Sequence, residues 1–559
     1  MLFSCSGITL EPMPTEDPIG RLPKEDAAGG GAVATAFPDA TQAGLAMLQA
    51  GGNAVDAAVA ASWALAVCEP SSSGLGGSAV VLFRSADGKT VVLDGHSRAP
   101  AAVSKKTVSR SQQTKGYRAC TIPSMVATID VLQARHGLLD PGRVMEPAIH
   151  LAENGYPVTK LQHRQQRWSQ SDLLDQPEAR RLFLRNGEPL EEGDVLRQPE
   201  LAATLRRLAR AGADDFYRGR IAREIAEDMA ANGGLLTRED LADFRPPAEG
   251  EPQSIRYRDC PVLSSGPPSG GMQVLLALSV LEQMPPDRFP GRSDDWYEAL
   301  AEVTWAVFRD RQARAARKGG KTASADIGRH AREILESMRG PPGTPAPRPA
   351  REQPGETTHL CAADAQGNIV ALTQSLQSLF GAKVANGKLG FLYNNYLCTL
   401  PRRQHPYRIR GGGVPRSNAA PTLVLTGEPS RRPLLVLGAA GSRRITSAIV
   451  QVISSVVDRG LTVRQAVDLP RIHATLSGTA HLERPAATDS LLGRLESRFH
   501  SVRIRSARSF YMGSVQAIQW NEDASVTGAA DPRRDGTAGL LHAREAGPPH
   551  PATPGGQET

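Results

Sequence analysis

The stretch from Thr357 to Leu376 reads Thr-Thr-His-Leu-Cys-Ala-Ala-Asp-Ala-Gln-Gly-Asn-Ile-Val-Ala-Leu-Thr-Gln-Ser-Leu. One apolar run, His359 to Ala363, is followed by a polar turn, Asp364 to Asn368, and then by a second apolar run, Ile369 to Leu372. Gly367 lies inside the turn, where the backbone needs a conformation that glycine adopts easily. Two short apolar runs around such a turn predict a β-hairpin.

The residues just before the hairpin, 340–356, are rich in proline, glycine and charged side chains and lack the apolar residues of a packed core. We expect them to form a flexible linker that leads to a strand starting with a hydroxyl residue. If the bond between Glu356 and Thr357 were cut, Thr357 would carry a free α-amine beside its own hydroxyl. Such an amine can act as the general base that activates a weak nucleophile. The hairpin alone is explained more simply by an ordinary strand that begins with two threonines.

The composition of the whole chain is typical of a soluble globular protein. Of its 559 residues, 40% are hydrophobic and 22% are charged. The net charge of +7 is small for this length, and arginine pairs are scattered instead of forming a basic stripe interleaved with aromatic residues. Nucleic-acid binding needs such a stripe, so we do not expect it. No run of about 18 apolar residues occurs, so no membrane-spanning helix is expected.

The cysteines lie far apart and form no Cys-x-x-Cys pair, a spacing typical of free thiols in a reducing compartment. They are Cys5, Cys68, Cys120, Cys260, Cys361 and Cys398. No group of residues has the spacing of metal ligands, and no cofactor is expected. Residues 1–20 contain neither the basic start nor the apolar stretch of a signal peptide, so a cytoplasmic location is expected.

Both ends of the chain are expected to lack a fixed structure. Residues 1–30 are interpreted as a flexible arm that ends in consecutive glycines, and residues 545–559 as a disordered tail rich in proline and glycine. Just after the arm, Asn53 can cap a helix that is apolar on most sides. A helix of this kind is expected to be buried.

A glycine-rich turn is the second candidate for a functional element. The sequence predicts a strand that ends near Leu437, a turn Gly438-Ala439-Ala440-Gly441-Ser442, and a helix over residues 443–457. Backbone N–H groups at a helix N-terminus can stabilise negative charge that develops during a reaction. With a nucleophile nearby, Gly441 and Ser442 would form an oxyanion hole. Without one, the segment is an ordinary tight turn.

Together these motifs resemble the γ-glutamyltransferase family. Thr-Thr-His from Thr357, the Asp-x-x-Gly-Asn turn and Thr373-x-Ser375 resemble the start of its small subunit. The run Gly-Gly-Asn-Ala-Val-Asp-Ala-Ala-Val-Ala from Gly51 resembles its N-terminal signature, and the resemblance extends over about residues 33–536. Members of this family are N-terminal-nucleophile hydrolases that cut their own chain directly before the catalytic threonine.

The resemblance implies an α+β fold, a four-layer αββα sandwich of the N-terminal-nucleophile hydrolase type, formed jointly by two autoproteolytic fragments. Residues 31–339 would be the large-subunit portion and residues 357–544 the small-subunit portion, with the linker at 340–356 between them. The two fragments would associate with each other and act on a small-molecule amide, with neither nucleic acid nor membrane as a partner. The sequence by itself supports only a mixture of helices and strands with several hairpins.

The resemblance also implies acyl transfer through a covalent ester. Thr357 Oγ would first attack the Glu356 carbonyl to cut the chain, and later attack substrate amides while the α-amine takes the proton. Ser375 takes the place of a family threonine that hydrogen-bonds to the nucleophile, and Thr373 is a lesser candidate for this role. His359 would share a strand face with Thr357. We interpret His359 as structural, because the free amine already supplies the base.

The expected acyl pocket departs from the family pattern. In that pattern, an arginine and a Ser-Ser pair hold the α-carboxylate of a γ-glutamyl group. Acidic and amide side chains hold its α-amine. The corresponding residues here are His96 with Arg98 two residues on, Ser417-Asn418 for the serine pair, Tyr396 at the amide position, Thr399 at the acidic position, and Gln377 in place of an asparagine. Because Thr399 carries no charge, a buried ammonium group would lack an ionic partner. We therefore expect a closer similarity to the family's acylase branch, which removes glutaryl-type groups from β-lactam nuclei. The histidine, arginine, serine and asparagine would grip one carboxylate, and the tyrosine would cover an apolar acyl group.

Several alternatives stay open at this point. The chain could be a true γ-glutamyltransferase or glutathione hydrolase with altered donor contacts. It could also be an unprocessed relative that binds a ligand without catalysis, and the substituted pocket side chains could simply fill space. A serine–histidine hydrolase is disfavoured, because the Gly-x-Ser-x-Gly motif does not occur in the sequence.

Overall fold

The computed structural model describes residues 30–285, 293–316, 326–338, 355–403, 405–523 and 525–541. Most of the predicted N-terminal arm, most of the predicted linker and the whole predicted tail lie outside the described residues. The linker prediction is wrong at its end, because Gly355 and Glu356 already belong to a strand. That strand can include them because the partner strand of the hairpin is long enough to pair with both residues.

The hairpin predicted from Thr357 onward is confirmed and forms the centre of a seven-stranded sheet. The order of strands in this sheet is β22-β1-β11-β12-β2-β3-β8, and all the neighbouring pairs are antiparallel. The strands are β1 Gly31–Thr35, β2 Ser78–Arg84, β3 Thr90–Gly95, β8 Glu249–Gly250, β11 Gly355–Asp364, β12 Ile369–Ser378 and β22 Thr537–Leu541. The hairpin strands β11 and β12 therefore have strands from the N-terminal half of the chain on both sides.

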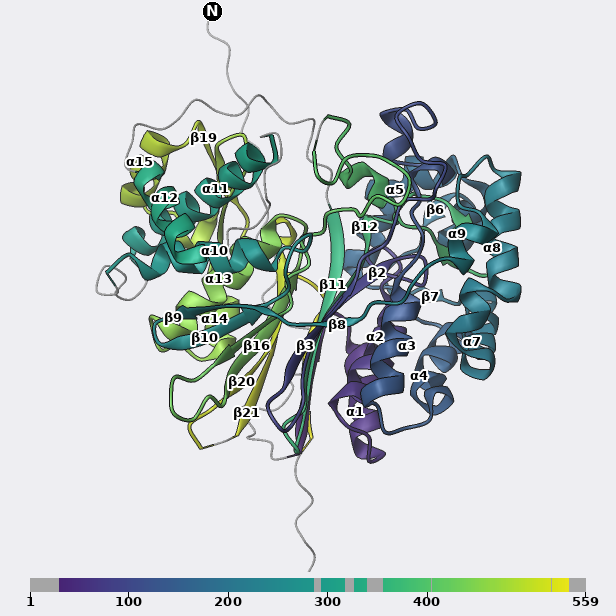
Figure 1. Cartoon of the computed structure of the whole chain (residues 1–559), viewed down its shortest axis with the longest axis horizontal. Helices are drawn as coiled ribbons and strands as arrows, with labels where there is room; N and C mark the ends of the chain where they lie inside the picture. The colour runs from purple at the N-terminus through teal and green to yellow at the C-terminus, as the bar shows by residue number, and fades with distance from the viewer. Residues whose placement is uncertain are drawn as a thin grey trace, which may run out of the picture.

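A second sheet has six strands in the order β21-β20-β16-β15-β10-β9, and its neighbouring pairs are also antiparallel. They are β9 Gln253–Tyr257, β10 Cys260–Ser264, β15 Thr422–Leu425, β16 Pro433–Ala440, β20 Ser514–Trp520 and β21 Val526–Ala530. The two sheets lie face to face in the middle of the molecule (Figure 1). Cys361 and Ala371 of the first sheet pack with Leu423 and Val436 of the second in one buried cluster between them.

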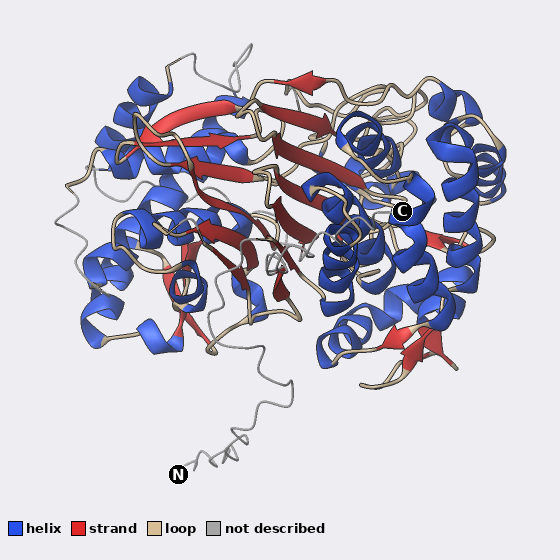
Figure 2. Ribbon diagram, turned by 90° about the horizontal axis from the view of Figure 1, so that it is seen from below, coloured by secondary structure: helices blue, strands red, loops and turns tan. Residues whose placement is uncertain are grey.

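Helices cover the outer face of each sheet, as Figures 1 and 2 show. On the side of the first sheet lie α1 Pro38–Gln49, α2 Ala54–Cys68, α3 Met125–His136, α4 Pro141–Asn154, α5 Lys160–Leu174, α6 Pro177–Phe183, α7 Pro199–Tyr217, α8 Arg220–Ala231 and α9 Arg238–Ala242. On the side of the second lie α10 Gly271–Glu282, α11 Asp294–Ala316, α12 Ile327–Met338, α13 Arg444–Val457, α14 Val463–Asp468 and α15 Asp489–Arg498. Each set of helices shares a buried apolar cluster with its sheet. The described residues therefore form layers in the order helix, sheet, sheet, helix.

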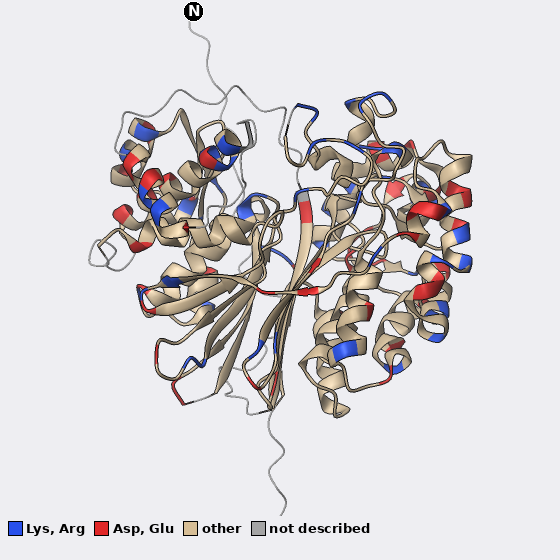
Figure 3. Ribbon diagram, in the orientation of Figure 1, with Lys and Arg blue, Asp and Glu red and all other residues tan. Residues whose placement is uncertain are grey.

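Shorter strands lie outside the two large sheets: β4 Tyr156–Pro157, β5 Leu184–Arg185, β6 Glu188–Pro189, β7 Val195–Leu196, β13 Ala385–Asn386, β14 Phe391–Leu392, β17 Ile472–Ala474, β18 Thr479–Glu483 and β19 Ser501–Arg505. Charged side chains gather on the outer helices and on loops, whereas the strands of the two central sheets carry few of them (Figure 3). This distribution fits two sheets that are covered on both faces.

The turn of the central hairpin is tied to helix α2. The Asp364 carboxylate accepts hydrogen bonds from the backbone N–H groups of Gln366 and Asn368 at 3.0 and 2.9 Å, and from that of Ala54 at 2.8 Å. The predicted cap at Asn53 is confirmed, because its side chain accepts hydrogen bonds at the start of α2. One carboxylate thus closes the turn and satisfies a free N–H group at the first turn of a buried helix.

The two sheets approach closely where Gly438 of β16 faces His359 of β11. A Cβ atom at Gly438 would lie 2.3 Å from the His359 ring, so a larger residue would require this buried ring to move. The prediction that Gly438 begins a turn is wrong, because β16 continues to Ala440. The glycine is needed for close packing between the sheets at this point.

None of the helices in the described ranges is long and apolar enough to cross a membrane. Within the same ranges the cysteine side chains Cys68, Cys120, Cys260, Cys361 and Cys398 are free thiols. Burial raises the pKa of each of the five thiols, so all of them are protonated at neutral pH.

Candidate active site

Thr357 lies near the start of β11, where the pairing with β12 is irregular. Glu356 pairs with Gln377 and Thr358 with Gln374, so β12 has one extra residue opposite Thr357. Gln377 adopts a φ of 83°, which accommodates this bulge. Thr357 is 7% exposed, and its hydroxyl is held inside the sheet.

The Ser375 hydroxyl joins the two residues on either side of the predicted cleavage site. It accepts a hydrogen bond from Thr357 Oγ1 at 3.2 Å and donates one to the Glu356 carbonyl oxygen at 2.6 Å. The backbone N–H of Gln377 also donates to Ser375 Oγ, at 2.8 Å. Ser375 is therefore fixed by the bulge and lies between the candidate nucleophile and the carbonyl that it would attack.

Arg534 holds the same peptide segment from another side. Its guanidinium donates to the Thr357 carbonyl oxygen at 3.2 Å and lies 2.7 Å from a carboxylate oxygen of Glu356. Burial raises the pKa of the Glu356 carboxyl, and the charge of Arg534 opposes that shift. Burial also raises the pKa of Glu69, which lies 3.8 Å from Arg534, to about 7. Sequence reasoning missed Arg534, although it directly follows the Asp-Pro-Arg motif that ends at Arg533.

His359 lies on the buried face between the sheets. One ring nitrogen lies 2.8 Å from the Thr373 hydroxyl, and the other lies 3.3 Å from the Cys361 sulfur. Complete burial lowers the pKa of His359 to about 3, so the ring is neutral at physiological pH. Both nitrogens contact neighbouring residues within the sheet, which fits a structural role. Thr373 contacts this ring, whereas Ser375 contacts the candidate nucleophile.

The glycine turn after β16 lies at the same end of the stacked sheets as Thr357. Gly438 of β16 lies next to His359 of β11. Strand β16 ends at Ala440, two residues after this contact, and Thr357 lies two residues before His359 in β11. The positive charge of Arg444, the first residue of α13, lowers the pKa of Glu356 against the larger effect of burial. The start of α13 therefore lies close enough to the predicted cleavage site to act on it electrostatically.

The turn itself has a backbone that requires small or flexible residues. Gly441 adopts a φ of 118° and Ser442 a φ of 58°, and helix α13 begins at Arg444. A Cβ atom at Gly441 would lie 2.9 Å from the Cα of Gly513, so the neighbouring loop leaves no room for a side chain. Strand, glycine turn and helix follow one another as the sequence predicts.

Tyr396 connects the nucleophile region to the predicted acyl pocket. It belongs to the 3-10 helix η4 Tyr396–Thr399, and its phenol is buried. Burial raises the pKa of its hydroxyl, and the nearby hydroxyls of Ser78, Ser375 and Ser417 oppose that shift, so the phenol is neutral. Sequence reasoning assigned Tyr396 to covering an apolar acyl group and missed Ser78. Ser78 could be found only through the strand register, which pairs it with Ser375.

The two predicted carboxylate anchors, His96 and Arg98, differ in burial and in contacts. His96 is buried, and its Nε2 atom lies 2.8 Å from the Ser269 hydroxyl and 3.0 Å from an Asp94 carboxylate oxygen. The Arg98 residue is exposed, and its backbone carbonyl accepts from the N–H of Ile122. No contact among the described residues joins the Arg98 side chain to the other predicted site residues, so the structure does not support its role as a substitute anchor.

Ser417 and Asn418 pack against a loop with the sequence Pro-Pro-Ser-Gly-Gly at residues 267–271. The backbone N–H of Ser417 donates to the Pro268 carbonyl at 3.3 Å. A Cβ atom at Gly270 would lie 2.3 Å from the Asn418 carbonyl oxygen, so this close approach needs a glycine. The Asn418 side-chain oxygen accepts a hydrogen bond from Arg311 at 3.1 Å. The predicted carboxylate-binding pair is thus joined to an arginine that sequence reasoning missed.

Of the remaining predicted pocket residues, Gln377 contacts η4 and Thr399 is the last residue of η4. The Gln377 side chain donates to the Cys398 sulfur at 3.5 Å, and the Thr399 hydroxyl donates to the Tyr396 carbonyl at 3.0 Å. Thr399 therefore offers neither a charge nor a free hydroxyl hydrogen. An ammonium group at this position would have no carboxylate from Thr399 to pair with.

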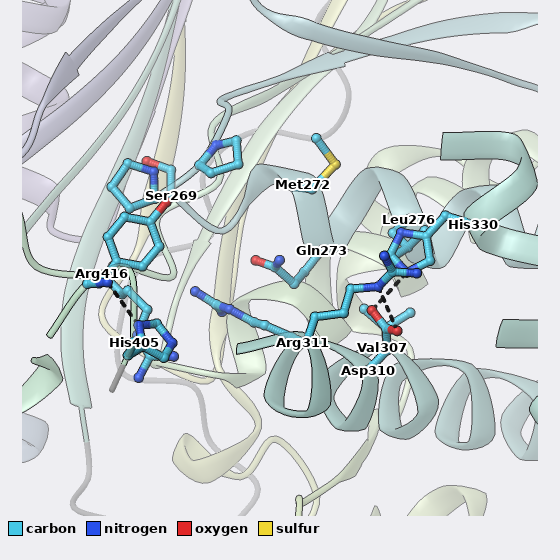
Figure 4. A pocket seen from close by; sticks show the side chains of 14 residues that line it. Ser269, Met272, Gln273, Leu276, Val307, Asp310, Arg311, His330, His405 and Arg416 are labelled. Carbon is cyan, nitrogen blue, oxygen red and sulfur yellow. Dashed lines mark hydrogen bonds and ion pairs between the residues drawn. The ribbon is translucent and has the colours of Figure 1, made fainter. Parts of the chain in front are cut away.

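A pocket opens beside the Ser417-Asn418 segment (Figure 4). It is lined by Pro267, Pro268, Ser269, Met272, Gln273, Leu276, Val307, Asp310, Arg311, Arg314, His330, His405, Tyr407 and Arg416. We refer to it as the arginine pocket. Arg416 directly precedes Ser417 in the sequence. This proximity to the predicted Ser417-Asn418 pair could have identified Arg416 as a candidate site residue.

The fold and the site together define the class of the protein. Two stacked antiparallel sheets lie between helical layers, and a threonine hydroxyl lies near the start of a central strand. The solved structure of the cephalosporin acylase from Bacillus halodurans matches this chain with a TM-score of 0.83 and 27% sequence identity, covering 95% of this chain and 99% of that chain. The chain therefore has a fold of the N-terminal-nucleophile type.

Residues 40–541 match the family described as gamma-glutamyltranspeptidase, and the chain belongs to this family. The glutathione hydrolase proenzyme of Escherichia coli (strain K12) is 32% identical over 546 residues, which cover 91% of this chain and 92% of that protein. The acylase ACY 1 proenzyme of Pseudomonas sp. (strain SE83) is 34% identical over 541 residues, which cover 92% of this chain and 94% of that protein. The predicted family is confirmed, and with it the expectation of an enzyme.

Proposed function

We propose that this chain is a self-processing threonine amidohydrolase or acyltransferase that cuts the amide of a glutaryl-like or γ-glutamyl-like acyl group through an acyl-enzyme. The observation that carries the proposal is the hydrogen-bonded chain from Thr357 Oγ1 through Ser375 Oγ to the Glu356 carbonyl. The Thr357 hydroxyl, the Ser375 hydroxyl and the Glu356 carbonyl lie together in the central hairpin, which supports attack by the first on the last. The two curated relatives described above are named proenzymes, which supports processing in this family.

Self-cleavage would begin with attack of Thr357 Oγ1 on the Glu356 carbonyl carbon. The new C–O bond replaces the C–N bond, and the hydroxyl proton passes to the α-nitrogen of Thr357, which leaves as an amine. Water then hydrolyses the ester and leaves a Glu356 carboxylate and a free Thr357 amine. The Ser375 hydroxyl donates to the carbonyl oxygen at 2.6 Å, which draws charge onto that oxygen as the attack requires. Two separate fragments would then build the four layers jointly.

In the processed protein, Thr357 Oγ1 would attack a substrate amide while its α-amine takes the proton. The backbone N–H groups of Gly441 and Ser442 would hold the oxyanion, a contribution of about 3 kcal/mol for each donor. The leaving amine takes the proton back from the Thr357 ammonium, and the acyl group stays on the oxygen as an ester. Water releases it in hydrolysis, and an acceptor amine releases it in acyl transfer.

The acyl group is proposed to lack an α-amine, as a glutaryl group does. Thr399 provides no charge for an ammonium, and its hydroxyl donates to the Tyr396 carbonyl. Two of the similar proteins are named acylases, which supports this choice. A γ-glutamyl group is the second candidate, because the glutathione hydrolase proenzyme is about as similar in sequence, at 32% against 34% identity.

A substrate panel tests this assignment. We expect the purified full chain to hydrolyse glutaryl 4-nitroanilide with a kcat/KM at least about tenfold above that for γ-glutamyl 4-nitroanilide, because the extra ammonium would be buried without a partner. Release of 4-nitroaniline is followed by its absorbance, with acetyl 4-nitroanilide as the control that lacks a carboxylate. A preference for the γ-glutamyl compound would favour the second candidate. If fully cleaved protein hydrolysed none of the three, the proposed amidohydrolase activity would be contradicted.

Arg534→Gln is expected to slow self-cleavage by about ten- to a hundredfold, because glutamine lacks the charge and reach that hold the attacked segment in place. The wild-type guanidinium contacts the Thr357 carbonyl at 3.2 Å and the Glu356 carboxylate at 2.7 Å. The measurement is the fraction of cleaved chain over time by intact-mass spectrometry. Arg508→Gln is the matched control, because Arg508 has an exposed ion pair with Asp468. Equal cleavage rates in the two variants would show that Arg534 does not position the bond.

A further inference from the structure

We propose that the arginine pocket binds a free carboxylate on the acyl group of the substrate, through the guanidinium groups of Arg311 and Arg416. This inference rests on the proposed function, because it names the chemical class of acyl group that the site accepts: an acyl chain with a second carboxylate. It assigns the binding of that carboxylate to residues outside the predicted set of His96, Arg98, Ser417 and Asn418.

The first support is geometric. Arg311 extends from α11 across the pocket, toward the side where His405 and Arg416 lie, and away from Asp310 (Figure 4). Its described hydrogen bond goes to a neutral group, the side-chain oxygen of Asn418, at 3.1 Å. The Nε atom of Arg416 is buried without a hydrogen-bond partner among the described residues. Two guanidinium groups therefore line one pocket with donor groups left to bind an anion.

The second support is the balance of charge in the pocket. Asp310 is the only carboxylate among the described residues that line it. Its oxygens lie 3.0 Å from Arg314 and 2.8 Å from His330, so Asp310 is paired with these two side chains, and Arg311 extends away from it (Figure 4). Buried cations without a counter-ion are costly, and a carboxylate from a ligand would remove that cost.

The proton affinities of the two arginines agree with this arrangement. Burial, followed by the positive charges of Arg416 and Arg443, lowers the pKa of Arg311 to about 9. Burial, followed by the charges of Arg443 and Arg403, lowers the pKa of Arg416 to about 10. Both groups remain protonated at neutral pH, and each is destabilised by the positive charge of its neighbours. A bound anion would reverse this effect.

The pocket adjoins the nucleophile through a continuous set of contacts. Arg311 donates a hydrogen bond to Asn418, which follows Ser417 in the chain, and the Ser417 hydroxyl lies near the Tyr396 hydroxyl and lowers its pKa. Ser375, which accepts a hydrogen bond from Thr357, also lies near the Tyr396 hydroxyl and lowers its pKa. These contacts run through the segment expected to form the acyl pocket. Arg416 directly precedes Ser417 and Arg311 contacts Asn418, so the arginines border the segment expected to hold the acyl group, and we assign the carboxylate to the acyl group and not to the leaving amine.

Binding of small acids by the full chain tests the proposal without requiring turnover. Glutarate and pentanoate have the same carbon chain, but only glutarate has a second carboxylate. In isothermal titration calorimetry we expect the wild-type protein to bind glutarate at least about tenfold tighter than pentanoate. Arg311→Gln and Arg416→Gln are each expected to lose that preference. Arg309→Gln is the matched control, because Arg309 lies on the same helix but stacks on Trp305 outside the pocket.

Each outcome decides the proposal. Equal affinities of the wild-type protein for both acids, absence of glutarate binding, or a preference that survives both glutamine variants would overturn it. A titration with 4-aminobenzoate tests whether the pocket binds a carboxylate on the leaving amine instead. If Arg416→Gln weakened binding of 4-aminobenzoate but not of glutarate, the carboxylate would belong to the leaving group. Arg416→Lys, which keeps the charge without the planar fork, should retain part of the preference and replaces the glutamine variant if that does not fold.

The same data separate this inference from the proposed function. Glutarate preference in a chain that never cleaves itself would uphold the pocket and contradict self-processing. Self-cleavage and anilide hydrolysis without any glutarate preference would uphold the proposed function and contradict the pocket.

Discussion

The Thr357→Ala chain is expected to stay a single polypeptide of 559 residues, whereas the wild-type chain separates into a fragment that ends at Glu356 and one that starts at Thr357. Removal of the hydroxyl removes the side chain that attacks the amide carbonyl in the proposed mechanism. We expect the loss of amide hydrolysis to be at least about 10⁴-fold, since knocking out a nucleophile typically costs this much or more. Intact-mass spectrometry measures cleavage, and release of 4-nitroaniline measures hydrolysis.

Two variants serve as controls for this result. Thr357→Ser keeps a hydroxyl at the same atom position and should still cleave, at a lower rate. Thr358→Val removes the neighbouring hydroxyl, which is buried on the opposite face of the strand, and should cleave like the wild type. If wild type and Thr357→Ala were both recovered whole, Thr357 would have no free amine, and a binding role without catalysis would become the better explanation.

Arg533→Met is expected to lower the free energy of unfolding by about 3 to 5 kcal/mol, the usual cost of breaking a buried ion pair from one side. Arg533 is fully buried between two carboxylates, with 2.9 Å to Glu483 and 3.1 Å to Asp531. It also donates to the carbonyl oxygens of Val467 and Leu469 at 3.0 and 2.8 Å. Methionine fills a similar volume but leaves both carboxylates and both carbonyls without these donors.

Urea denaturation followed by circular dichroism measures this effect, in a Thr357→Ala background so that one intact chain unfolds. Arg508→Met is the control, since it removes a cation from an exposed pair with Asp468, which is expected to change stability by less than about 1 kcal/mol. If the two variants were equally stable, the buried network would not stabilise the fold. Because Arg534 is the next residue, Arg533→Met should also slow self-cleavage.

The central features of the fold could be predicted because they depend on local sequence. The hairpin at β11 and β12 follows from two apolar runs around a turn with Gly367, and the cap at Asn53 follows from one side chain next to its helix. The glycine turn is predicted to begin at Gly438, but the strand continues to Ala440 and the turn begins at Gly441. A glycine such as Gly438 has two possible explanations, a turn or close packing, and only the contact with His359 decides between them.

The residues that surround the site could not be predicted from local patterns. Arg311 lies on α11, Arg534 near the C-terminus and Ser78 on β2, and none belongs to a motif with a recognisable spacing. The order of strands in the sheets and the contacts between loops bring these residues to the site. Both depend on residues that are far apart in the chain. Arg98 lies two residues after His96 and is exposed, and its suggested role as an anchor stays a prediction.

The order of strands in the sheets has a consequence for a chain cut between Glu356 and Thr357. In the first sheet β11 and β12 lie between β1 and β2, and β1 lies between β22 and β11. In the second sheet β15 is paired with β10, which precedes the predicted cleavage site in the chain. The two pieces are thus interwoven, so neither has a complete sheet or a closed core by itself. Cutting one peptide bond would release a chain end for chemistry while leaving a single cooperative unit, in which separation of the pieces means unfolding of both.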